Sequence, residues 1–310
     1  MPLFIRLADP DRDNGIVING PLKPMLACAA YPGVMALGIA LFGLTHSAGM
    51  TLQGSAVTAV VAGAGLITLL EWVLPYRAAW RANRSEIRND AAYMGLVQIL
   101  LPKLLSLAAV LWLADRMHGE DWLLREAWPH DLPVVAQAVL MVLCADFFRY
   151  WLHRASHRFE TLWRLHAVHH SPKKLYWFNV GRFHPVEKAL QYLLDSLPFL
   201  LLGVADVVLA SYFVFYAING FFQHSNCAIR LGWLNYLISG PELHRWHHSR
   251  EAAESNANYG NNLIVWDLLF GSFFLPRDRS VGALGLINPD YPSSFRAQFV
   301  APLTKGLDKA

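Results

Sequence analysis

Charged residues are scarce in this chain of 310 residues. Only 16% of the residues are Asp, Glu, Lys or Arg, whereas 55% are hydrophobic. Lys and Arg exceed Asp and Glu by 26 to 23, a bias too small to indicate a nucleic-acid partner. The three cysteines, Cys28, Cys144 and Cys227, form no C-x-x-C pair, which argues against a disulfide framework or a thiolate zinc site. The composition therefore indicates a chain embedded in a lipid bilayer.

Signatures of several other enzyme classes are also missing. The sequence has no H-E-x-x-H pattern of zinc proteases, no C-x-x-C-H haem attachment and no G-x-S-x-G elbow of hydrolases. Its first residues, M-P-L-F-I-R-L-A-D-P, lack the basic-then-apolar order of a cleaved signal peptide. What remains to be explained is a set of apolar runs and an unusual number of histidines.

The apolar runs predict four membrane crossings, each about long enough for a helix through the bilayer. They cover residues 25–44, 55–75, 96–114 and 132–152. The third run is interrupted by Pro102 and Lys103, so we expect it to be kinked or oblique.

A fifth apolar stretch, 189–222, is long enough for two short crossings or for one re-entrant hairpin. Its polar and turn-forming breaks favour the hairpin. These breaks are Asp195, Pro198, Gly203 and Asp206.

The distribution of Arg and Lys predicts the orientation, because short loops rich in these residues stay in the cytoplasm. Basic segments follow the second and fourth crossings, whereas the loops after the first and third are neutral and acidic. The expected fold is an all-α integral membrane protein with about four transmembrane helices, a re-entrant or short helical hairpin, and a cytoplasmic histidine-rich helical cap. The expected parts are a cytoplasmic segment 1–24, a transmembrane part 25–152, a histidine-rich catalytic region 153–275 and a tail 276–310.

Ten of the 13 histidines fall on the predicted cytoplasmic side, and eight of these form three clusters. Within each cluster the later histidines follow the first by three or four residues, which places their side chains on the same face of a helix as the first. Neutral imidazole is the commonest metal ligand among side chains. Eight to ten imidazoles suit two ions with roughly four or five ligands each. The candidate ligands are His153, His157, His166, His169, His170, His184, His224, His244, His247 and His248.

The remaining histidines, His46, His118 and His130, lie in loops predicted on the opposite side and are not expected to join the site. His184 and His224 each stand alone in the sequence. His184 is either a ligand or the residue before a helix whose first turn holds Pro185.

A membrane metal-ion transporter or metal-binding protein is the alternative use of such clusters. A transporter is expected to carry ionisable residues along its spans. The first three predicted spans contain only Glu71 and Lys103, so this alternative is the weaker one.

The histidine motifs resemble those of the fatty acid hydroxylase/sterol desaturase superfamily, a group of membrane di-iron enzymes. The three matching boxes are H-R-A-S-H from His153, H-A-V-H-H from His166 and H-R-W-H-H from His244. Supporting matches are R-F-H-P at 182–185, H-S-N at 224–226, N-Y-G at 258–260, W-D at 266–267 and F-G at 270–271. The resemblance covers residues 130–275 and is nearest to bacterial and alkylglycerol-monooxygenase-like members.

The resemblance implies a non-haem di-iron oxidoreductase that uses O2 to hydroxylate or desaturate a C–H bond of an acyl chain, sterol or related lipid. Its implied cofactors are two iron ions, which zinc can replace on purification, and O2. No fused cytochrome b5 domain is apparent, so an external electron donor, a separate protein or reductant, is expected. The lipid substrate would come from the bilayer, and the active site would face the cytoplasm at a bacterial inner membrane.

Several residues outside the boxes are further candidates. Asn226, Glu187 and Asp146, and also Asn258 and Asp267, could orient ligand imidazoles through hydrogen bonds. Ordinary cap or turn roles are equally compatible with each of these five residues.

Two tryptophans, Trp177 and Trp246, are candidates to line the path of the lipid, although anchoring at the membrane interface is the stronger alternative. The chain also departs from sphingolipid fatty acid 2-hydroxylases. Its first box has three intervening residues rather than four, and Gly220 stands where those enzymes have a histidine four residues before the position of His224.

Overall fold

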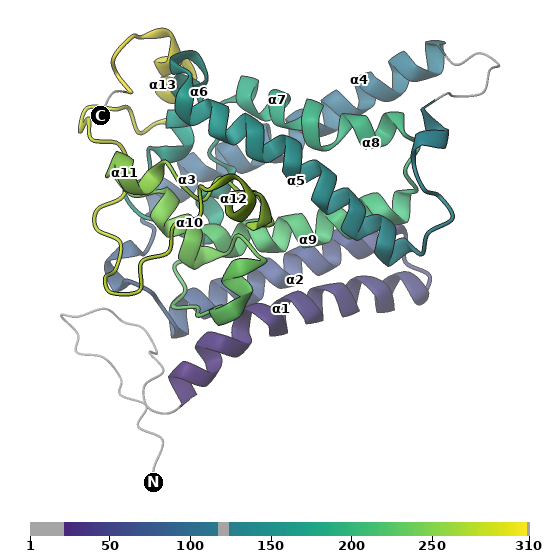
Figure 1. Cartoon of the computed structure of the whole chain (residues 1–310), viewed down its shortest axis with the longest axis horizontal. Helices are drawn as coiled ribbons and strands as arrows, with labels where there is room; N and C mark the ends of the chain where they lie inside the picture. Colours follow the sequence, from purple (N-terminus) through teal and green to yellow (C-terminus); the bar gives the residue numbers. More distant parts are fainter. Residues whose placement is uncertain (1–21, 117–123, 309–310) are drawn as a thin grey trace.

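The computed structural model describes residues 22–116 and 124–308. Within these residues all regular elements are helices, and β-structure is limited to isolated bridges. The longest helices run roughly side by side, whereas short helices that include α6, α10 and α11 gather at one end (Figure 1). The long elements are α1 (Leu22–Ser47), α2 (Leu52–Val73), α5 (Val134–Arg158), α9 (Asp206–His224) and the continuous run α3 (Arg84–Ala92), η2 (Tyr93–Leu100) and α4 (Leu101–Arg116).

Shorter elements connect and cap these helices. The α-helices are α6 (Glu160–His170), α7 (Pro185–Asp195), α8 (Leu197–Leu201), α10 (Pro241–His247), α11 (Ala252–Ser255), α12 (Val265–Phe270) and α13 (Phe295–Val300). The 3-10 helices are η1 (Ala78–Trp80), η3 (Arg125–Ala127), η4 (Trp177–Gly181), η5 (Gly232–Tyr236) and η6 (Ala301–Leu303).

Five helices in the described residues are long and apolar enough to cross a membrane. They span Leu22–Ser47, Leu52–Val73, Arg84–Trp112, Val134–Arg158 and Asp206–His224. The all-α membrane fold expected from the sequence is thereby confirmed, with one refinement: the fifth helix, α9, comes from the stretch predicted as a hairpin. Two of the expected breaks do not interrupt α9, because Gly203 forms the turn before it and Asp206 lies in its first turn, where a carboxylate suits the helix dipole.

The segment before α9 forms the other arm of this hairpin. It consists of α7 and α8, and the chain breaks between them at Ser196, just before Pro198. Phe199 of α8 packs edge-on against Trp128, with ring centroids 5.8 Å apart. Trp128 follows η3, so the apex of the hairpin lies at the end of the molecule remote from α6, α10 and α11 (Figure 1).

The third long segment changes its helical type before Pro102. Residues Tyr93–Leu100 form a π-helix, and the amide of Leu101 bonds to the carbonyl of Leu96, five residues earlier. A wide helical turn of this kind adjusts the register of the backbone next to a proline, which cannot donate a hydrogen bond.

Close packing joins α1 and α2 to α9. The side chain of Ile218 on α9 fills the space beside Gly38 and Gly63, where an added Cβ would lie 2.5 Å and 2.9 Å from its atoms. Tyr31 of α1 donates a 2.8 Å hydrogen bond to Asn219, the next residue of α9. The absence of side chains at these two glycines therefore allows α9 to lie directly against the first two helices.

Buried carboxylates attach the long helices to the segments that carry the histidines. Glu71, near the end of α2, accepts the amide hydrogens of Trp177 and Asn226 at 2.7 Å and 2.8 Å. Asp146 of α5 accepts the amide hydrogens of Asn262 and Leu263 at 2.7 Å and 2.5 Å. These bonds fix three loops at the end of the helix bundle where the histidines lie.

Candidate metal centre

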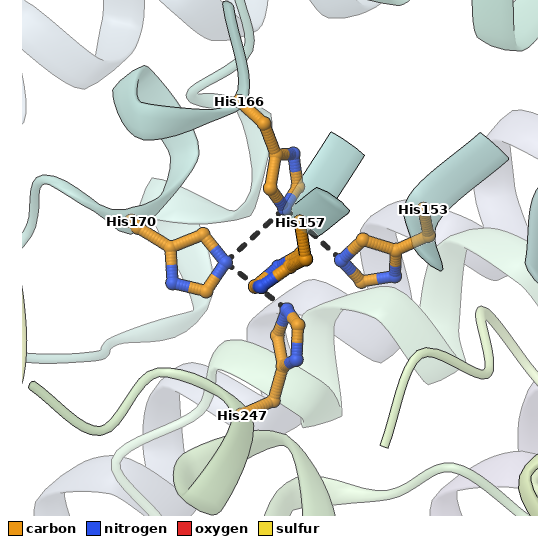
Figure 2. A group of neighbouring side chains, drawn as sticks. All are labelled: His153, His157, His166, His170 and His247. Atoms are coloured by element: carbon orange, nitrogen blue, oxygen red, sulfur yellow. Dashed lines mark hydrogen bonds between the residues drawn. The ribbon is translucent and has the colours of Figure 1, made fainter. Parts of the chain in front are cut away.

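Five histidines from three helices form the first group at this end of the molecule. Candidate ligand nitrogens of all five lie within 4.8 Å of one another, and Figure 2 shows the rings arranged around a common centre. The residues are His153 and His157 of α5, His166 and His170 of α6, and His247 of α10. The Nε2 atom of His166 is 3.0 Å from that of His153 and 3.1 Å from that of His170.

The outer nitrogens of this first group are held by oxygen atoms. Nδ1 of His153 donates to the carbonyl of Tyr259 at 2.8 Å, and Nδ1 of His247 donates to that of Ala257 at 2.8 Å. Nδ1 of His166 donates to Oε1 of Glu187 at 2.7 Å. A carbonyl or an ionised carboxylate can only accept, so the ring proton resides on Nδ1 and Nε2 presents a lone pair.

This tautomer has a direct consequence for the inner nitrogens. When both rings are neutral, as imidazole ligands are, Nε2 of His153 and Nε2 of His166 face each other at 3.0 Å with no proton between them. Two lone pairs at this distance repel unless a cation lies between the rings. Neutral imidazoles oriented by oxygen acceptors on their outer nitrogen are the usual form of histidine metal ligands.

Four further histidines form the second group. Their candidate ligand nitrogens also lie within 4.8 Å of one another, and all four residues are buried. Nε2 of His248 is 3.2 Å from Nε2 of His169 and 3.0 Å from Nε2 of His244. The fourth member, His224, ends α9 and donates from Nδ1 to Oδ1 of Asn179 at 2.7 Å. Nδ1 of His169 donates to the carbonyl of Arg182 at 3.2 Å.

The two groups adjoin. The rings of His170 and His248, one from each group, stack with centroids 4.6 Å apart. Spacing along the helices divides the ligands: His166 and His170, four residues apart, enter the first group, whereas His169 enters the second. A step of four residues rotates a side chain by about 40° around a helix and a step of three by about 60° the other way, since each residue adds about 100°. The sequence predicted that all histidines of a cluster face one way; in the structure, the second and third clusters each divide between the two groups.

Burial favours the neutral form of imidazoles in both groups. Burial, together with the neighbouring imidazoles, lowers the pKa of His169, His170, His244 and His248 well below the usual value. The pKa of His247 falls to about 3 for the same reasons, with His166 as the neighbour. Neutral rings are the form that binds a metal ion.

The donor set fits two metal ions, one in each group. Nε2 of His157 and Nε2 of His224 are buried nitrogens without a hydrogen-bond partner. An unpaired buried polar atom is costly, and a bound cation would satisfy it. All nine ligands are nitrogens, a set compatible with iron, zinc or copper.

A cavity of about 760 Å³ extends from the histidines into the helix bundle. Members of both groups line it, including His153 and His166 of the first and His169, His224 and His244 of the second. Its walls come from α2, the η2–α4 segment, α5, α7 and α9. The volume is within the range of pockets that enclose small ligands.

Comparison with known proteins then identifies the family. Residues 138–272 match the sequence model of the fatty acid hydroxylase family. A protein named ornithine lipid hydroxylase OlsE, from Rhizobium tropici, is 35% identical over 250 residues, which cover 77% of this chain and 73% of that protein. The chain belongs to the fatty acid hydroxylase family.

More distant relatives of the chain include two eukaryotic enzymes. Alkylglycerol monooxygenase of Danio rerio is 28% identical over 200 residues, covering 64% of this chain and 42% of that enzyme. Lathosterol oxidase of Homo sapiens is 29% identical over 150 residues, covering 48% of this chain and 49% of that enzyme. The chain thus spans less than half the length of either enzyme. No solved structure matches the chain.

The expected family and the expected enzyme class, an oxidoreductase, are confirmed by these relatives. A transporter is correspondingly disfavoured.

Nine of the ten histidines proposed as ligands in this fatty acid hydroxylase family member lie in the two groups. The structure does not bring His184 to either group. Its Nε2 donates to the carbonyl of Phe299 at 3.0 Å, and its Nδ1 accepts the amide hydrogen of Val186 at 3.2 Å. His184 thus caps α7, with Pro185 as the first helical residue. The structure therefore corresponds to the second of the two interpretations given for this residue.

The histidines expected to stand apart lie elsewhere as far as they are described. His46 lies in the last turn of α1, where its Nδ1 is 3.3 Å from the carbonyl of Met50. Nε2 of His130 donates to the carbonyl of Arg125 at 3.0 Å. His118 lies outside the described residues.

The residues proposed to orient ligands act at different distances from the rings. Glu187 contacts His166 directly. Asp267 accepts the amide hydrogen of Tyr259 at 2.8 Å and so fixes the loop whose carbonyl binds His153. The hydrogen bonds of the remaining candidates hold the backbone of the cap. Asp146 binds the amides of residues 262–263, Asn226 the carbonyl of Arg77, and Asn258 the carbonyls of Leu243 and Phe274.

Sequence reasoning missed several partners of the ligands. Asn179 and Asn256 bond to His224 and His157 through side-chain oxygens. Asn179 lies three residues before Arg182 of the R-F-H-P motif, and that proximity was the available signal. The carbonyls of Ala257, Tyr259 and Arg182 have no side-chain signature, so no sequence pattern identifies them.

The two proposed substrate-path tryptophans lie outside the cavity lining. Trp177 packs against Phe221, with ring centroids 5.0 Å apart. Trp246 is buried in a separate cluster with Trp80 and Leu175. The Phe and Tyr residues that α9 contributes to the cavity lining are Tyr212, Phe213, Tyr216 and Phe221.

Proposed function

We propose that this protein is a membrane-bound, O2-dependent oxidoreductase that hydroxylates or desaturates a C–H bond of a lipid, using two iron ions held by nine imidazoles. The observation that carries this proposal is the pair of adjoining imidazole groups at one end of a cavity that reaches into the bundle. The named relatives, an ornithine lipid hydroxylase, an alkylglycerol monooxygenase and a lathosterol oxidase, support the reaction class.

The first imidazole group would hold one ion and the second group the other. Bound iron supplies the one-electron chemistry with O2 that an unactivated C–H bond requires. The protein supplies orientation and exclusion of water. Glu187, at 2.7 Å, keeps the proton of His166 on Nδ1, so Nε2 stays available as a ligand. The carbonyls of Tyr259 and Ala257 do the same for His153 and His247.

The substrate would enter the cavity from the bilayer. Four apolar residues that line the cavity are also exposed on the outside of the bundle, with exposed fractions between 45% and 64%. They are Val57 and Val61 of α2, Ile99 of η2 and Phe213 of α9. Since all four lie within helices long enough to cross a membrane, this opening faces hydrocarbon rather than water. A lipid chain could therefore reach the imidazoles without leaving an apolar environment.

The orientation in the membrane follows from charge. Four Arg between 77 and 88 and the basic residues 149–182 lie near the histidine end, which supports a cytoplasmic position for the centre at a bacterial inner membrane. The electrons would come from a separate donor, a protein or small reductant that reaches this face.

The test compares His170→Ala with His46→Ala in membranes and as purified protein. His170 belongs to the first group and its ring stacks on the second, so its removal should abolish lipid oxidation and lower the bound iron from two ions per chain. His46 is exposed at the end of α1, and its replacement should leave both quantities unchanged.

Iron must be measured after anaerobic reconstitution with Fe(II), because zinc can occupy imidazole sites during purification. Lipid products would be compared by mass spectrometry in cells with and without the intact gene. Full oxidation of lipid by the His170→Ala protein, or wild-type protein that binds no iron, would contradict the proposal.

A further inference from the structure

The wall of the cavity next to the metal centre is polar, although the cavity opens toward hydrocarbon. Helix α7 contributes Glu187, Lys188 and Gln191 to this wall, and α9 contributes Tyr212 and Tyr216. All but Tyr216 are buried. A purely hydrocarbon substrate needs no such groups, and charged side chains at membrane depth are costly unless they have a function.

Most charges on this wall are paired. Arg149 of α5 donates to Asp195 of α7 at 2.7 Å and to Oδ1 of Asn261 at 3.2 Å. Glu187 is engaged by Nδ1 of His166 and by the side-chain amide of Gln191 at 3.1 Å. Arg149, Asp195 and Glu187 therefore all have partners within the protein.

Lys188 is different, since it makes no ion pair within the described part of the chain. Its ammonium group donates one hydrogen bond, to the hydroxyl of Tyr216 at 3.2 Å, and lies 5.9 Å from the ring centroid of Phe183. An ammonium group has three donors, so two remain for a group inside the cavity. Phe183 stacks on His169 of the second imidazole group, with ring centroids 4.2 Å apart, so this cation lies near the metal centre.

Unpaired oxygens surround the same space. Oε2 of Glu187, Oε1 of Gln191 and the hydroxyl of Tyr212 are buried and have no hydrogen-bond partner. All three residues line the cavity. Buried polar groups are normally satisfied, so these atoms indicate a ligand that brings its own donors.

We propose that Lys188 binds an anionic group, a carboxylate or a phosphate, on the lipid substrate, and that Gln191 and Tyr212 bind hydrogen-bonding groups beside it. The hydrocarbon of the same molecule then extends toward Val57, Val61 and Phe213 at the opening of the cavity. The substrate is thus an acidic or zwitterionic amphiphile whose polar end lies closer to the imidazoles than its tail. This inference deepens the proposed function and rests on it.

The test measures binding rather than turnover, with purified, iron-reconstituted protein in detergent. The probes are three ligands with the same hydrocarbon chain: oleic acid, oleoyl lysophosphatidic acid and oleyl alcohol. Wild-type protein should bind at least one acidic probe about 10- to 100-fold more tightly than the alcohol, since hydrogen bonds to a charged group are worth about 1.5–3 kcal/mol. Preference for oleic acid identifies a carboxylate and preference for lysophosphatidic acid a phosphate.

Lys188→Met keeps the length of the side chain and removes the charge, and it should abolish the preference. Lys188→Arg should retain part of it. The matched control is Lys173→Met, because Lys173 is exposed and lies outside the cavity lining. Iron content is measured in every variant and should be unchanged.

Equal binding of the acid and the alcohol by wild-type protein would overturn the role of Lys188 while leaving the proposed function intact. Tighter binding of the acidic probe than of the alcohol by the Lys188→Met protein would also overturn the role of Lys188. Loss of iron in the wild-type protein would instead contradict the proposed function. The wild-type comparison decides the question even if Lys188→Met fails to fold.

Discussion

The hydrogen bond between Glu187 and His166 should control how tightly the first imidazole group holds its ion. The atoms are 2.7 Å apart, and the side chains of Glu187 and His166 are only 5% and 2% exposed. A hydrogen bond to a charged group contributes about 1.5–3 kcal/mol, and the loss of such a ligand partner typically costs about 10- to 100-fold in metal affinity. We expect Glu187→Ala to weaken iron binding at this group about 100-fold.

Glu187→Gln should have a smaller effect of about 10-fold, because an amide oxygen still accepts from Nδ1 but carries no full charge. The measurement is a chelator titration of the anaerobic Fe(II) protein, with bound iron counted per chain. The second group has its own oxygen partners, so one ion should leave at low chelator concentration and the other at the wild-type concentration.

The control is Glu160→Gln, an exposed carboxylate on the same helix as His166. Its titration should overlay that of the wild-type protein. If Glu187→Ala released both ions together, or released neither earlier than the wild type, the assignment of Glu187 to one imidazole group would be refuted.

Three further changes test other parts of the structure. Asn179→Ala removes the 2.7 Å partner of His224 and should loosen the ion of the second group about 10- to 100-fold in the same titration, leaving the first ion in place. Gly63→Leu should lower stability by about 1–3 kcal/mol because it forces α2 away from α9, whereas Gly65→Leu on the same helix meets open space and should be nearly neutral in thermal unfolding. Both carboxylate oxygens of Asp146 accept N–H groups, so in Asp146→Asn the new NH2 must face a donor, and the apparent melting temperature should fall by roughly 5 °C; an unchanged value would show that loop 261–263 is held otherwise.

Much of the fold follows from local patterns that need no tertiary information. The apolar runs alone locate four crossings, since the length of a helix through the bilayer is fixed by the thickness of the bilayer. The stretch 189–222 was harder to interpret. Asp206 and Gly203 read as breaks in one apolar run, but they mark the boundary between two helices, and only the packed structure distinguishes an interruption from an end.

The candidate site shows the same division. Histidines at spacings of three and four predict shared helix faces, and nine of the ten proposed ligands do converge. His184 could not be separated from the others by sequence, because a histidine before a proline satisfies both interpretations. The structure distinguishes the two interpretations, because both ring nitrogens of His184 are hydrogen-bonded, to the amide of Val186 and to the carbonyl of Phe299.

Hydropathy and helical spacing are properties of short segments, and they suffice to predict a helical membrane protein with many imidazoles at one end. Which imidazoles share an ion depends on how the helices pack, since His166 and His169 leave the same helix about 60° apart and reach different partners from α10. The packing also determines which nitrogen of a ring faces the centre. The carbonyl that binds His153 belongs to Tyr259, 106 residues later, and the carbonyl that binds His247 belongs to Ala257, 10 residues later. Backbone oxygens are the same in every residue, and their positions depend only on how the whole chain packs.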